Sequence, residues 1–371
     1  MTLTEPRRSD GDAYGAAEDA LEAGRTLPAG WYTDPAVFAR ERQLIFMRGW
    51  LFAGMVGDIP AAGDYVARNI GPVPALVVRG ERGEINAFAN VCQHRGARLV
   101  PSGCGHQARL RCPYHAWTYD LDGRLHNAPR AKRNARFDPE GIALRRLRLE
   151  LLGPMMFVCA DVDAAPLETV FGGMLEALVE RNRRPRMDLR LYARREHEVA
   201  ANWKVLCENG FECYHCPACH ASFSATVDVS ADFVFELHED YTVHGLPGER
   251  IRADSTQQRA VLAHLWPNVF PAVKADDLVA TLQIVPLDVG RSIYRREYWA
   301  TDDVDEDTRD GFIELLDHAD VEDAEICPQV YAGLASSFFE SGPLLLPVTE
   351  VGVHHFQRRV HRALAGDCAG P

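Results

Sequence analysis

Two groups of residues with metal-binding side chains follow one another along the 371-residue chain. The first group consists of two pairs, Cys92 with His94 and Cys112 with His115, and residues 95–111 lie between the pairs. The members of the second group, all within residues 212–220, are Glu212, His215 and His220. Thiolates and imidazoles together bind zinc or iron, whereas imidazoles with a carboxylate bind iron that reacts with oxygen. The residue types and spacings therefore predict two metal sites with different chemistry.

The first group alternates cysteine with histidine, reading C-Q-H at 92–94 and C-P-Y-H at 112–115. A Rieske 2Fe–2S cluster requires this alternation, because two thiolates hold one iron and two imidazoles hold the other. A structural zinc site usually pairs cysteine with cysteine and histidine with histidine. The pattern predicts a Rieske cluster, with a zinc site and unliganded core histidines as the alternatives.

The other cysteines of this region predict a cluster without a disulfide. Respiratory-chain Rieske proteins join an extra cysteine of each loop, but Ala97 and Tyr114 stand at those positions here, and Cys104 is predicted to be a bystander. Residues 1–24 are polar and lack the apolar centre of a signal peptide, which predicts a cytoplasmic protein. We therefore expect the ten cysteines to be thiols or metal ligands rather than disulfides.

The second group is predicted to lie at the end of a helix that starts at Asn202 and runs to about residue 214. Pro217 would interrupt this helix, and the resulting turn would bring His220 beside His215, which an unbroken helix with a spacing of five would not do. Two histidines and a carboxylate on one face suit oxygen-activating iron. A zinc or redox cluster in the C-x2-C-x2-C run at 213–219, or a pair of core histidines, is the alternative.

The carboxylate of this site is predicted to come from a helix over residues 321–334. Ile326, Val330 and Leu334 form its apolar stripe, and Asp323 lies on the same face three residues earlier, whereas Glu322 and Glu325 point away. A carboxylate directed toward the core needs a cation, and iron would supply one. Asp323 is therefore the predicted third iron ligand.

The remaining pattern predicts a mixed helix and strand protein. A helix is expected within 35–50, followed by a small β domain to about residue 160 with strands at 65–67, 75–78 and 156–158 and a hairpin turn at 122–123. Helices at 202–215 and 305–335 and a strand at 291–300 follow. The arginine-rich stretch 181–195 is interpreted as a connector rather than a nucleic-acid site, because the net charge is −13. No apolar run is long enough to span a bilayer.

Four motifs give this chain a resemblance to a known family. They are N-V-C-Q-H-R-G at 90–96, C-P-Y-H-A-W at 112–117, N-W-K-V-L-C-E-N at 202–209 and E-C-Y-H-C-P-A-C-H at 212–220. Over residues 27–363 the chain resembles the terminal oxygenase α subunit of Rieske non-haem iron oxygenases. Most members have aspartate where this chain has Glu212, and glutamate there is similar to the branch that oxidises carnitine, choline and glycine betaine.

The resemblance implies a fold and roles for single residues. It implies an α+β fold with a Rieske antiparallel β domain inserted into a helix-grip catalytic domain, divided into an N-terminal segment 1–44, a Rieske domain 45–160 and a catalytic domain 161–371. The implied cluster ligands are Cys92, His94, Cys112 and His115, and the implied iron ligands are His215, His220 and Asp323. Glu212 would bridge to a cluster histidine of the neighbouring subunit in a homotrimer, and Asn209 would lie near the iron.

The implied activity is that of an oxygenase. Dioxygen and electrons from a separate flavin and iron–sulfur reductase, which takes them from NAD(P)H, would be used to hydroxylate a small organic substrate. We expect a quaternary ammonium or N-methyl compound and oxidative N-dealkylation; the candidate aromatic residues around a cation are Phe233, Phe235, Tyr241, Trp266 and Phe270. Ring hydroxylation of an aromatic acid is the first alternative. A Rieske electron carrier and a zinc-stabilised binding protein are alternatives from other classes.

Overall fold

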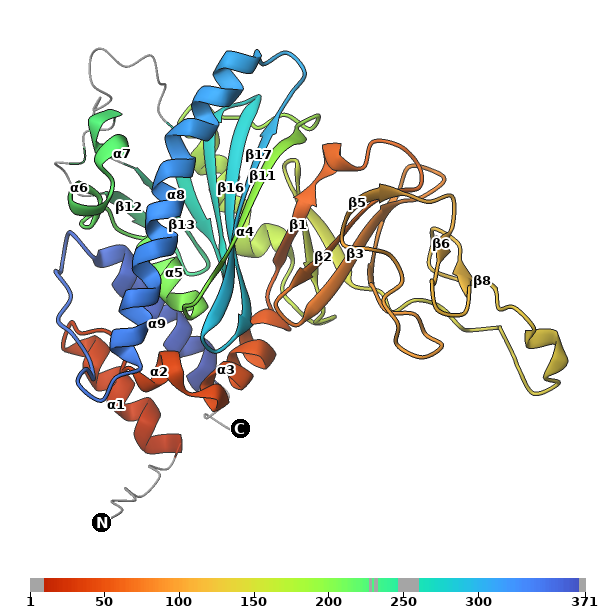
Figure 1. The fold of residues 1–371 in the computed structure, drawn as a ribbon, viewed down its shortest axis with the longest axis horizontal. Helices are drawn as coiled ribbons and strands as arrows, with labels where there is room; N and C mark the ends of the chain where they lie inside the picture. Colours follow the sequence, from red (N-terminus) through yellow and green to blue (C-terminus); the bar gives the residue numbers. More distant parts are fainter. Residues whose placement is uncertain (1–9, 227–228, 230–232, 246–259, 367–371) are drawn as a thin grey trace.

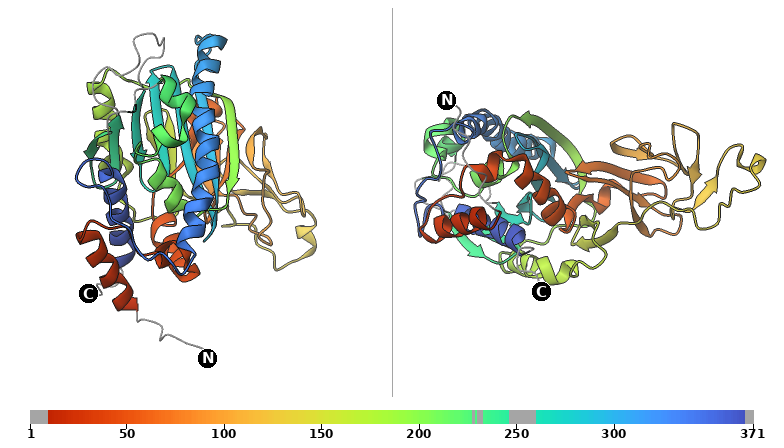
Figure 2. Two further views of the ribbon diagram at one scale, coloured as in Figure 1. Left: turned by 60° about the vertical axis from the view of Figure 1, so that its left-hand side comes forward. Right: turned by 90° about the horizontal axis from the view of Figure 1, so that it is seen from below.

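The computed structural model describes residues 10–226, 229, 233–245 and 260–366 and contains two regions (Figure 1). A β-rich region spans residues 51–159, and a larger region of helices and one sheet follows it in the chain. The right-hand view of Figure 2 shows the β-rich region extending away from the helices. This arrangement confirms the predicted α+β class, while the boundaries at residues 44 and 160 stay predictions.

The β-rich region consists of three small antiparallel sheets. One sheet has the order β4-β3-β2-β5, with β2 (Asp64–Ile70), β3 (Val73–Arg79), β4 (Ile85–Ala89) and β5 (Gly103–His106). Another has the order β6-β7-β8, with β6 (Leu110–Arg111), β7 (Thr118–Tyr119) and β8 (Leu125–Asn127). The third has the order β1-β10-β9, with β1 (Leu51–Met55), β9 (Arg148–Leu152) and β10 (Met155–Cys159). The strands predicted at 65–67, 75–78 and 156–158 and the hairpin at 122–123 are confirmed.

Two hydrophobic cores divide this region. Leu76, Phe88 and Tyr119 belong to a core of the β-rich region alone, and Cys92 and Cys112 are buried in it. The sheet of β1, β9 and β10 instead contributes to the core of the catalytic region. The cysteines of both predicted cluster loops are therefore anchored in one core, which is separate from the core of the catalytic region.

The catalytic region contains a seven-stranded antiparallel sheet with the order β11-β17-β16-β15-β14-β13-β12. Its strands are β11 (Arg190–Val199), β12 (Val234–Leu237), β13 (Tyr241–Gly245), β14 (Val261–Leu265), β15 (Val269–Ala275), β16 (Leu278–Asp288) and β17 (Arg291–Ala300). The helices around it are α4 (Leu167–Glu180), α5 (Trp203–Asn209), α6 (Cys216–Cys219), α7 (Ala221–Thr226), α8 (Glu306–Leu334) and α9 (Val351–Ala365). The long helix α8 lies across one face of the sheet (Figure 1), and the strand predicted at 291–300 and the helix predicted at 305–335 are confirmed.

The N-terminal residues pack on the catalytic region. They form α1 (Asp10–Glu22), α2 (Gly30–Thr33), α3 (Pro35–Glu41) and a π-helical turn (Arg42–Phe46). The end of α3 is tied to α5, because Glu41 accepts hydrogen bonds from the buried Lys204 ammonium and from Trp203 Nε1 at 2.7 Å. Within the described residues, no helix is both long and apolar enough to cross a membrane.

Helix α8 buries the predicted face only in part. Val330, assigned to the buried stripe, is 49% exposed, whereas the buried positions are Phe312, Asp320, Asp323 and Cys327. Asp320 decides this orientation, because it accepts two hydrogen bonds from Arg296, at 2.6 and 2.8 Å, and one from Tyr294 at 2.9 Å. A polar anchor to the sheet thus orients the helix. Of the predicted stripe, Ile326 and Leu334 pack partly buried against the core and Asp323 is buried as expected, whereas Val330 is exposed.

Helix α5 is shorter than predicted. The Asn202 side chain accepts the Lys204 N–H and caps its first turn, but the helix ends at Asn209 rather than near residue 214. His215 then precedes the short helix α6, and Pro217 lies in the first turn of α6, where its missing N–H costs nothing. The proline therefore starts a helix here and does not interrupt one.

The arginine-rich stretch was only partly a connector. Its second half is in strand β11, where Arg194 contacts the buried carboxylate of Glu297 at 2.6 Å. Arg186 pairs with Asp188 and with Asp303. These ion pairs join the stretch to the sheet and to the segment that follows β17.

Candidate active site and metal centres

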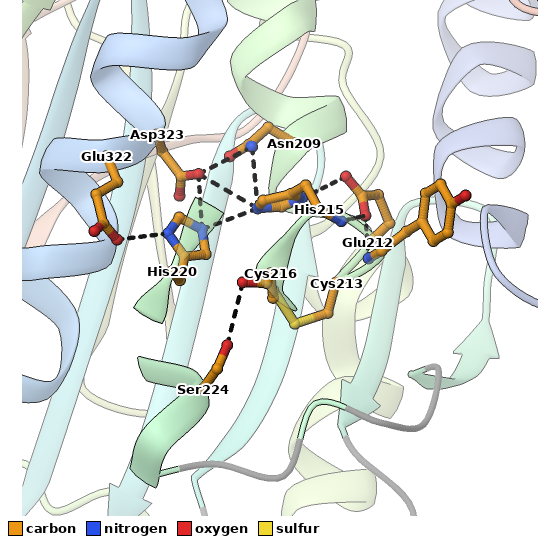
Figure 3. Close-up of a disulfide and its surroundings, with 10 residues drawn as sticks. Asn209, Glu212, Cys213, His215, Cys216, His220, Ser224, Glu322 and Asp323 are labelled. Atoms are coloured by element: carbon orange, nitrogen blue, oxygen red, sulfur yellow. Dashed lines mark hydrogen bonds and ion pairs between the residues drawn. A yellow bond between two sulfur atoms is a disulfide. The ribbon is translucent and has the colours of Figure 1, made fainter. Parts of the chain in front are cut away.

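The end of α5, the loop after it and the middle of α8 bring four side chains together (Figure 3). The Nε2 atoms of His215 and His220 are 3.0 Å apart. Asp323 Oδ1 lies 3.4 Å from His215 Nε2 and 3.1 Å from His220 Nε2. Asn209 Nδ2 donates to the same Asp323 oxygen at 3.0 Å and lies 3.3 Å from His215 Nε2. The structure thus places the three predicted iron ligands and Asn209 around one point.

The charges at this point favour a cation. Burial alone would raise the pKa of Asp323, but hydrogen bonds from His215 and His220 lower it to about 2. Burial alone would lower the pKa of His215, but Asp323 and Glu212 raise it to about 10. The anionic surroundings thus favour a positive charge at the two imidazoles. Two imidazoles beside one buried carboxylate are the ligands of the two-histidine, one-carboxylate iron sites. The residues therefore fit a divalent iron ion.

Glu212 holds the first histidine of this set. Its Oε2 accepts the backbone N–H of Tyr214 and, at 3.1 Å, that of His215, while Oε1 contacts His215 Nδ1 at 2.5 Å. The carboxylate thereby closes the loop on itself and directs Nε2 of His215 toward Asp323. Both carboxylate oxygens of Glu212 therefore have partners within the loop, and the side chain is only partly buried.

Glu322 contacts the second histidine, His220, and this role of Glu322 was not predicted from the sequence. Its Oε2 lies 2.9 Å from His220 Nδ1, so this glutamate does not point away from the site as expected. A carboxylate on the outer nitrogen fixes the ring orientation and the tautomer of a metal-bound histidine. Its place directly before Asp323 was the only signal in the sequence.

The loop also contains a disulfide between Cys213 and Cys216, which corrects the expectation that no cysteine is oxidised. The expectation followed from the inferred compartment, whereas three residues of separation on a tight turn place the two sulfurs within bonding distance. Both cysteines are buried, at 7% and 5% exposure, while Tyr214 between them is 63% exposed. Cys219 is a free thiol.

The two predicted cluster loops have the same backbone conformation. The N–H of Gly96 donates to Cys92 O at 3.0 Å, and the N–H of Ala116 donates to Cys112 O at 3.1 Å. Gly96 and Ala116 both have left-handed φ values, 71° and 57°, which side chains other than glycine seldom adopt. Each loop therefore turns back on its cysteine and carries one cysteine and one histidine within the turn.

The sulfur and imidazole sides of these loops differ in exposure. Cys92 and Cys112 are each 2% exposed, whereas His94 and His115 are exposed. The ring of His94 lies stacked on Trp117 at a centroid distance of 4.6 Å and packs edge-on against His115 at 4.8 Å. Two buried thiolates beside two outward imidazoles fit a Rieske cluster, whose histidine iron lies nearest the surface.

The five aromatic residues considered for cation binding fall into two classes. Trp266 and Phe270 are buried, and Arg359 already lies over the Trp266 ring at 4.6 Å. Tyr241 is 9% exposed and is stacked on His238. Phe233 and Phe235 remain partly exposed, with ring centroids 6.0 Å apart.

Comparisons with known proteins agree with this arrangement. Residues 49–144 match the family described as Rieske [2Fe-2S] domain, and residues 186–366 match the family described as ring hydroxylating alpha subunit (catalytic domain). The carnitine monooxygenase oxygenase subunit of Escherichia coli (strain K12) is 30% identical, over 89% of this chain and 91% of its own. The chloroplastic choline monooxygenase of Atriplex hortensis is 29% identical, over 96% of this chain and 81% of its own.

A solved structure shows the same likeness. The quaternary ammonium Rieske monooxygenase CntA, whose structure was described with insights into carnitine oxidation and inter-subunit electron transfer, is 26% identical with a TM-score of 0.82. The match covers 93% of this chain and 98% of that one. The chain therefore belongs to the Rieske non-haem iron oxygenases, as a catalytic α subunit. It is an oxygenase that combines a Rieske 2Fe–2S cluster with a mononuclear iron.

Proposed function

We propose that this chain is the oxygenase component of a quaternary ammonium monooxygenase. The observation that carries the proposal is the likeness, over about nine-tenths of the chain, to the choline and carnitine monooxygenases. The balanced reaction is R–H + O2 + 2 electrons + 2 H+ → R–OH + H2O. Hydroxylation at a carbon bonded to nitrogen gives a product that breaks the C–N bond, so N-dealkylation follows.

The proposed metal ligands are the residues that the site brings together. The mononuclear iron is held by His215, His220 and Asp323, and when bound it supplies open positions for dioxygen. The proposed cluster ligands are Cys92, His94, Cys112 and His115. Electrons come from a separate NAD(P)H-dependent reductase with flavin and iron–sulfur groups.

Residues around the iron ligands have positioning roles in this proposal. Glu212 and Glu322 hold the outer nitrogens of His215 and His220, so the inner nitrogens converge without a large loss of side-chain entropy when the metal binds. Asn209 donates to Asp323 and keeps the carboxylate oxygen directed at both rings. Glu212, which is partly exposed, also accepts a hydrogen bond from a cluster histidine in this proposal.

That histidine belongs to a neighbouring subunit, in a homotrimer. Two observations support this part of the proposal. Helix α6, next to the iron ligands, and strands β6 and β8, next to the second cluster loop, lie at opposite sides of the chain in Figure 1. His94 and His115 are also exposed, so their outer nitrogens can reach another chain.

A cationic substrate agrees with the local charge. Phe233 and Phe235 pack against His244, whose pKa is lowered to about 3 by burial, so this imidazole is neutral and does not repel a cation. Aromatic faces attract quaternary ammonium groups through their negative π surface. We therefore place these two phenylalanines beside the trimethylammonium group.

The substrate is tested by mass spectrometry of products formed under 18O2. Protein with about three irons, two in the cluster and one alone, is combined with a reductase and offered carnitine, choline, glycine betaine and a set of aromatic acids. We expect one labelled oxygen, or the N-dealkylation products, from quaternary ammonium compounds only. Labelled hydroxyaromatic acids instead would refute the substrate and favour ring hydroxylation, and a colourless zinc protein would refute the cluster.

The trimer is tested by mixing two inactive variants in one assembly. His94→Ala lacks a cluster ligand and Asp323→Ala lacks an iron ligand, so each homotrimer should be inactive. In mixed trimers an intact cluster can face a neighbour with an intact iron site, and part of the activity should return. Mixed trimers that retain the expected metals and stay inactive would contradict electron transfer between subunits.

A further inference from the structure

The disulfide ring at Cys213–Cys216 lies against the iron-binding histidines. The ring encloses Tyr214 and His215, so one of the proposed iron ligands is part of the ring itself (Figure 3). The Cys216 sulfur and one nitrogen each of His215 and His220 all lie within 4.8 Å of one another. In the disulfide this sulfur is bonded to Cys213.

We propose that Cys216 is a redox-controlled metal ligand of this site. Reduction of the disulfide frees its sulfur, which then joins His215 and His220 and binds Zn2+. The proposal rests on the proposed role of these histidines as metal ligands. In the reduction, Cys213–S–S–Cys216 + 2 RSH gives two cysteine thiols + RS–SR, with a low-molecular-weight thiol as the electron donor. The Cys216 thiol loses its proton to water when the metal binds.

The consequence for metal choice follows from ligand softness and number. With the disulfide intact, the site offers two imidazoles and the Asp323 carboxylate, an open set that suits iron and leaves room for dioxygen. When the disulfide is reduced, the Cys216 thiolate and the two imidazoles form a second convergent set that shares both histidines. A thiolate together with imidazoles is typical of zinc sites, and the soft sulfur favours zinc over iron.

The positions of the other cysteines single out Cys216. Cys213 bonds to it in the oxidised protein, so cleavage of that one bond is sufficient to release the sulfur. Cys219 is already a free thiol, and it is not one of the three side chains that converge within 4.8 Å. The chain therefore offers matched variants: Cys213→Ser leaves the Cys216 thiol permanently free, and Cys216→Ser removes it while also breaking the disulfide.

Zinc K-edge X-ray absorption provides the test, because cluster iron does not contribute at that edge. The mononuclear site of the cluster-containing protein is emptied by chelation, loaded with one Zn2+ and measured before and after a trialkylphosphine. The phosphine becomes a phosphine oxide with oxygen from water and adds no sulfur of its own. We expect nitrogen and oxygen neighbours near 2.0–2.1 Å before reduction, and one sulfur near 2.3 Å after it.

The variants decide the source of the sulfur. Cys213→Ser should show the 2.3 Å sulfur without reductant, Cys216→Ser should never show it, and Cys219→Ser should behave as the unmodified protein. No sulfur in the reduced protein, sulfur before reduction, or sulfur in Cys216→Ser would each overturn the proposal and leave the iron assignment standing. Zinc that binds equally well to Asp323→Ala and to a His215→Ala variant would instead refute the proposed iron site, and this inference with it.

Discussion

The two metal regions hold their histidines in opposite ways. At the iron site, the outer nitrogens of His215 and His220 contact Glu212 and Glu322, and the inner nitrogens converge on Asp323. At the cluster loops, His94 is held by stacking on Trp117. Among the residues that the structure describes, no hydrogen-bond partner contacts a ring nitrogen of His94 or of His115.

The difference indicates what each region still lacks. Fixed outer contacts make the iron ligands ready for a metal before it arrives. The cluster histidines lie beside buried cysteines and are exposed, and in the proposed trimer their outer contacts come from the neighbouring subunit. In that trimer a cluster histidine of one chain would contact the Glu212 loop of another. Four substitutions test the iron site and the cluster region separately.

Asp323→Ala should have the largest effect, a complete loss of turnover, because the remaining histidines lose the anion that balances the metal. Iron analysis should give two irons per chain instead of three, with an unchanged cluster spectrum. Glu325→Ala is the matched control, since Glu325 is exposed on the same helix. Retained iron and turnover in Asp323→Ala would show that another carboxylate is the ligand.

Glu212→Gln, measured at saturating iron so that both metal sites are filled, should lower turnover by roughly 100-fold. The carboxamide has one accepting oxygen, so it cannot serve His215 and a partner's histidine together. Stopped-flow absorbance should show a reduced cluster that persists with substrate and oxygen present. Rapid reoxidation of the cluster in this variant would mean that electrons use a path without Glu212.

Glu322→Gln should weaken iron binding at the mononuclear site by roughly 10–100-fold, because His220 loses an anionic partner at its outer nitrogen. Chelator competition measures the change, and saturating iron should restore most of the turnover. Glu325→Gln serves as the control. An iron affinity equal to that of the control would assign Glu322 no part in holding the metal.

Tyr119→Phe should have the smallest effect and act on the cluster alone. Tyr119 Oη accepts the Gln93 N–H, which leaves its own hydrogen for the Cys92 sulfur at 3.3 Å. This bond stabilises the more negative, reduced cluster, and its loss of about 1 kcal/mol corresponds to a one-electron potential roughly 40 mV lower. A redox titration measures the shift; an unchanged potential would mean that the hydroxyl does not donate to this sulfur.

The sequence predicted those features whose cause is local. The alternation of cysteine and histidine at 92–94 and 112–115 and the alternating strands depend on near neighbours, and the structure contains both loops and the strands. It missed the anchor of α8 at Asp320, because the partners Arg296 and Tyr294 lie on the sheet and no periodicity within the helix contains that information. It missed Glu322 for the same reason, since the partner, His220, lies on a distant loop.

The end of α5 and the disulfide were missed for a related reason. Asn209 closes the helix while its side chain contacts Asp323, which is 114 residues away. The turn that follows brings Cys213 and Cys216 together, and an assumption about cellular compartment carried no information on that geometry.

The Glu41–Lys204 pair has a consequence for building chimeric oxygenases. Two family descriptions match this chain as if it were two modules, but a buried ion pair joins α3, before the first module, to α5 in the second. Removing one partner of such a pair costs on the order of 3–5 kcal/mol, a large part of the stability of a domain. A graft that exchanges the Rieske module should therefore keep residues 10–48 from the same parent as the catalytic module. In this protein a helix that precedes the Rieske module is completed by a helix that follows it.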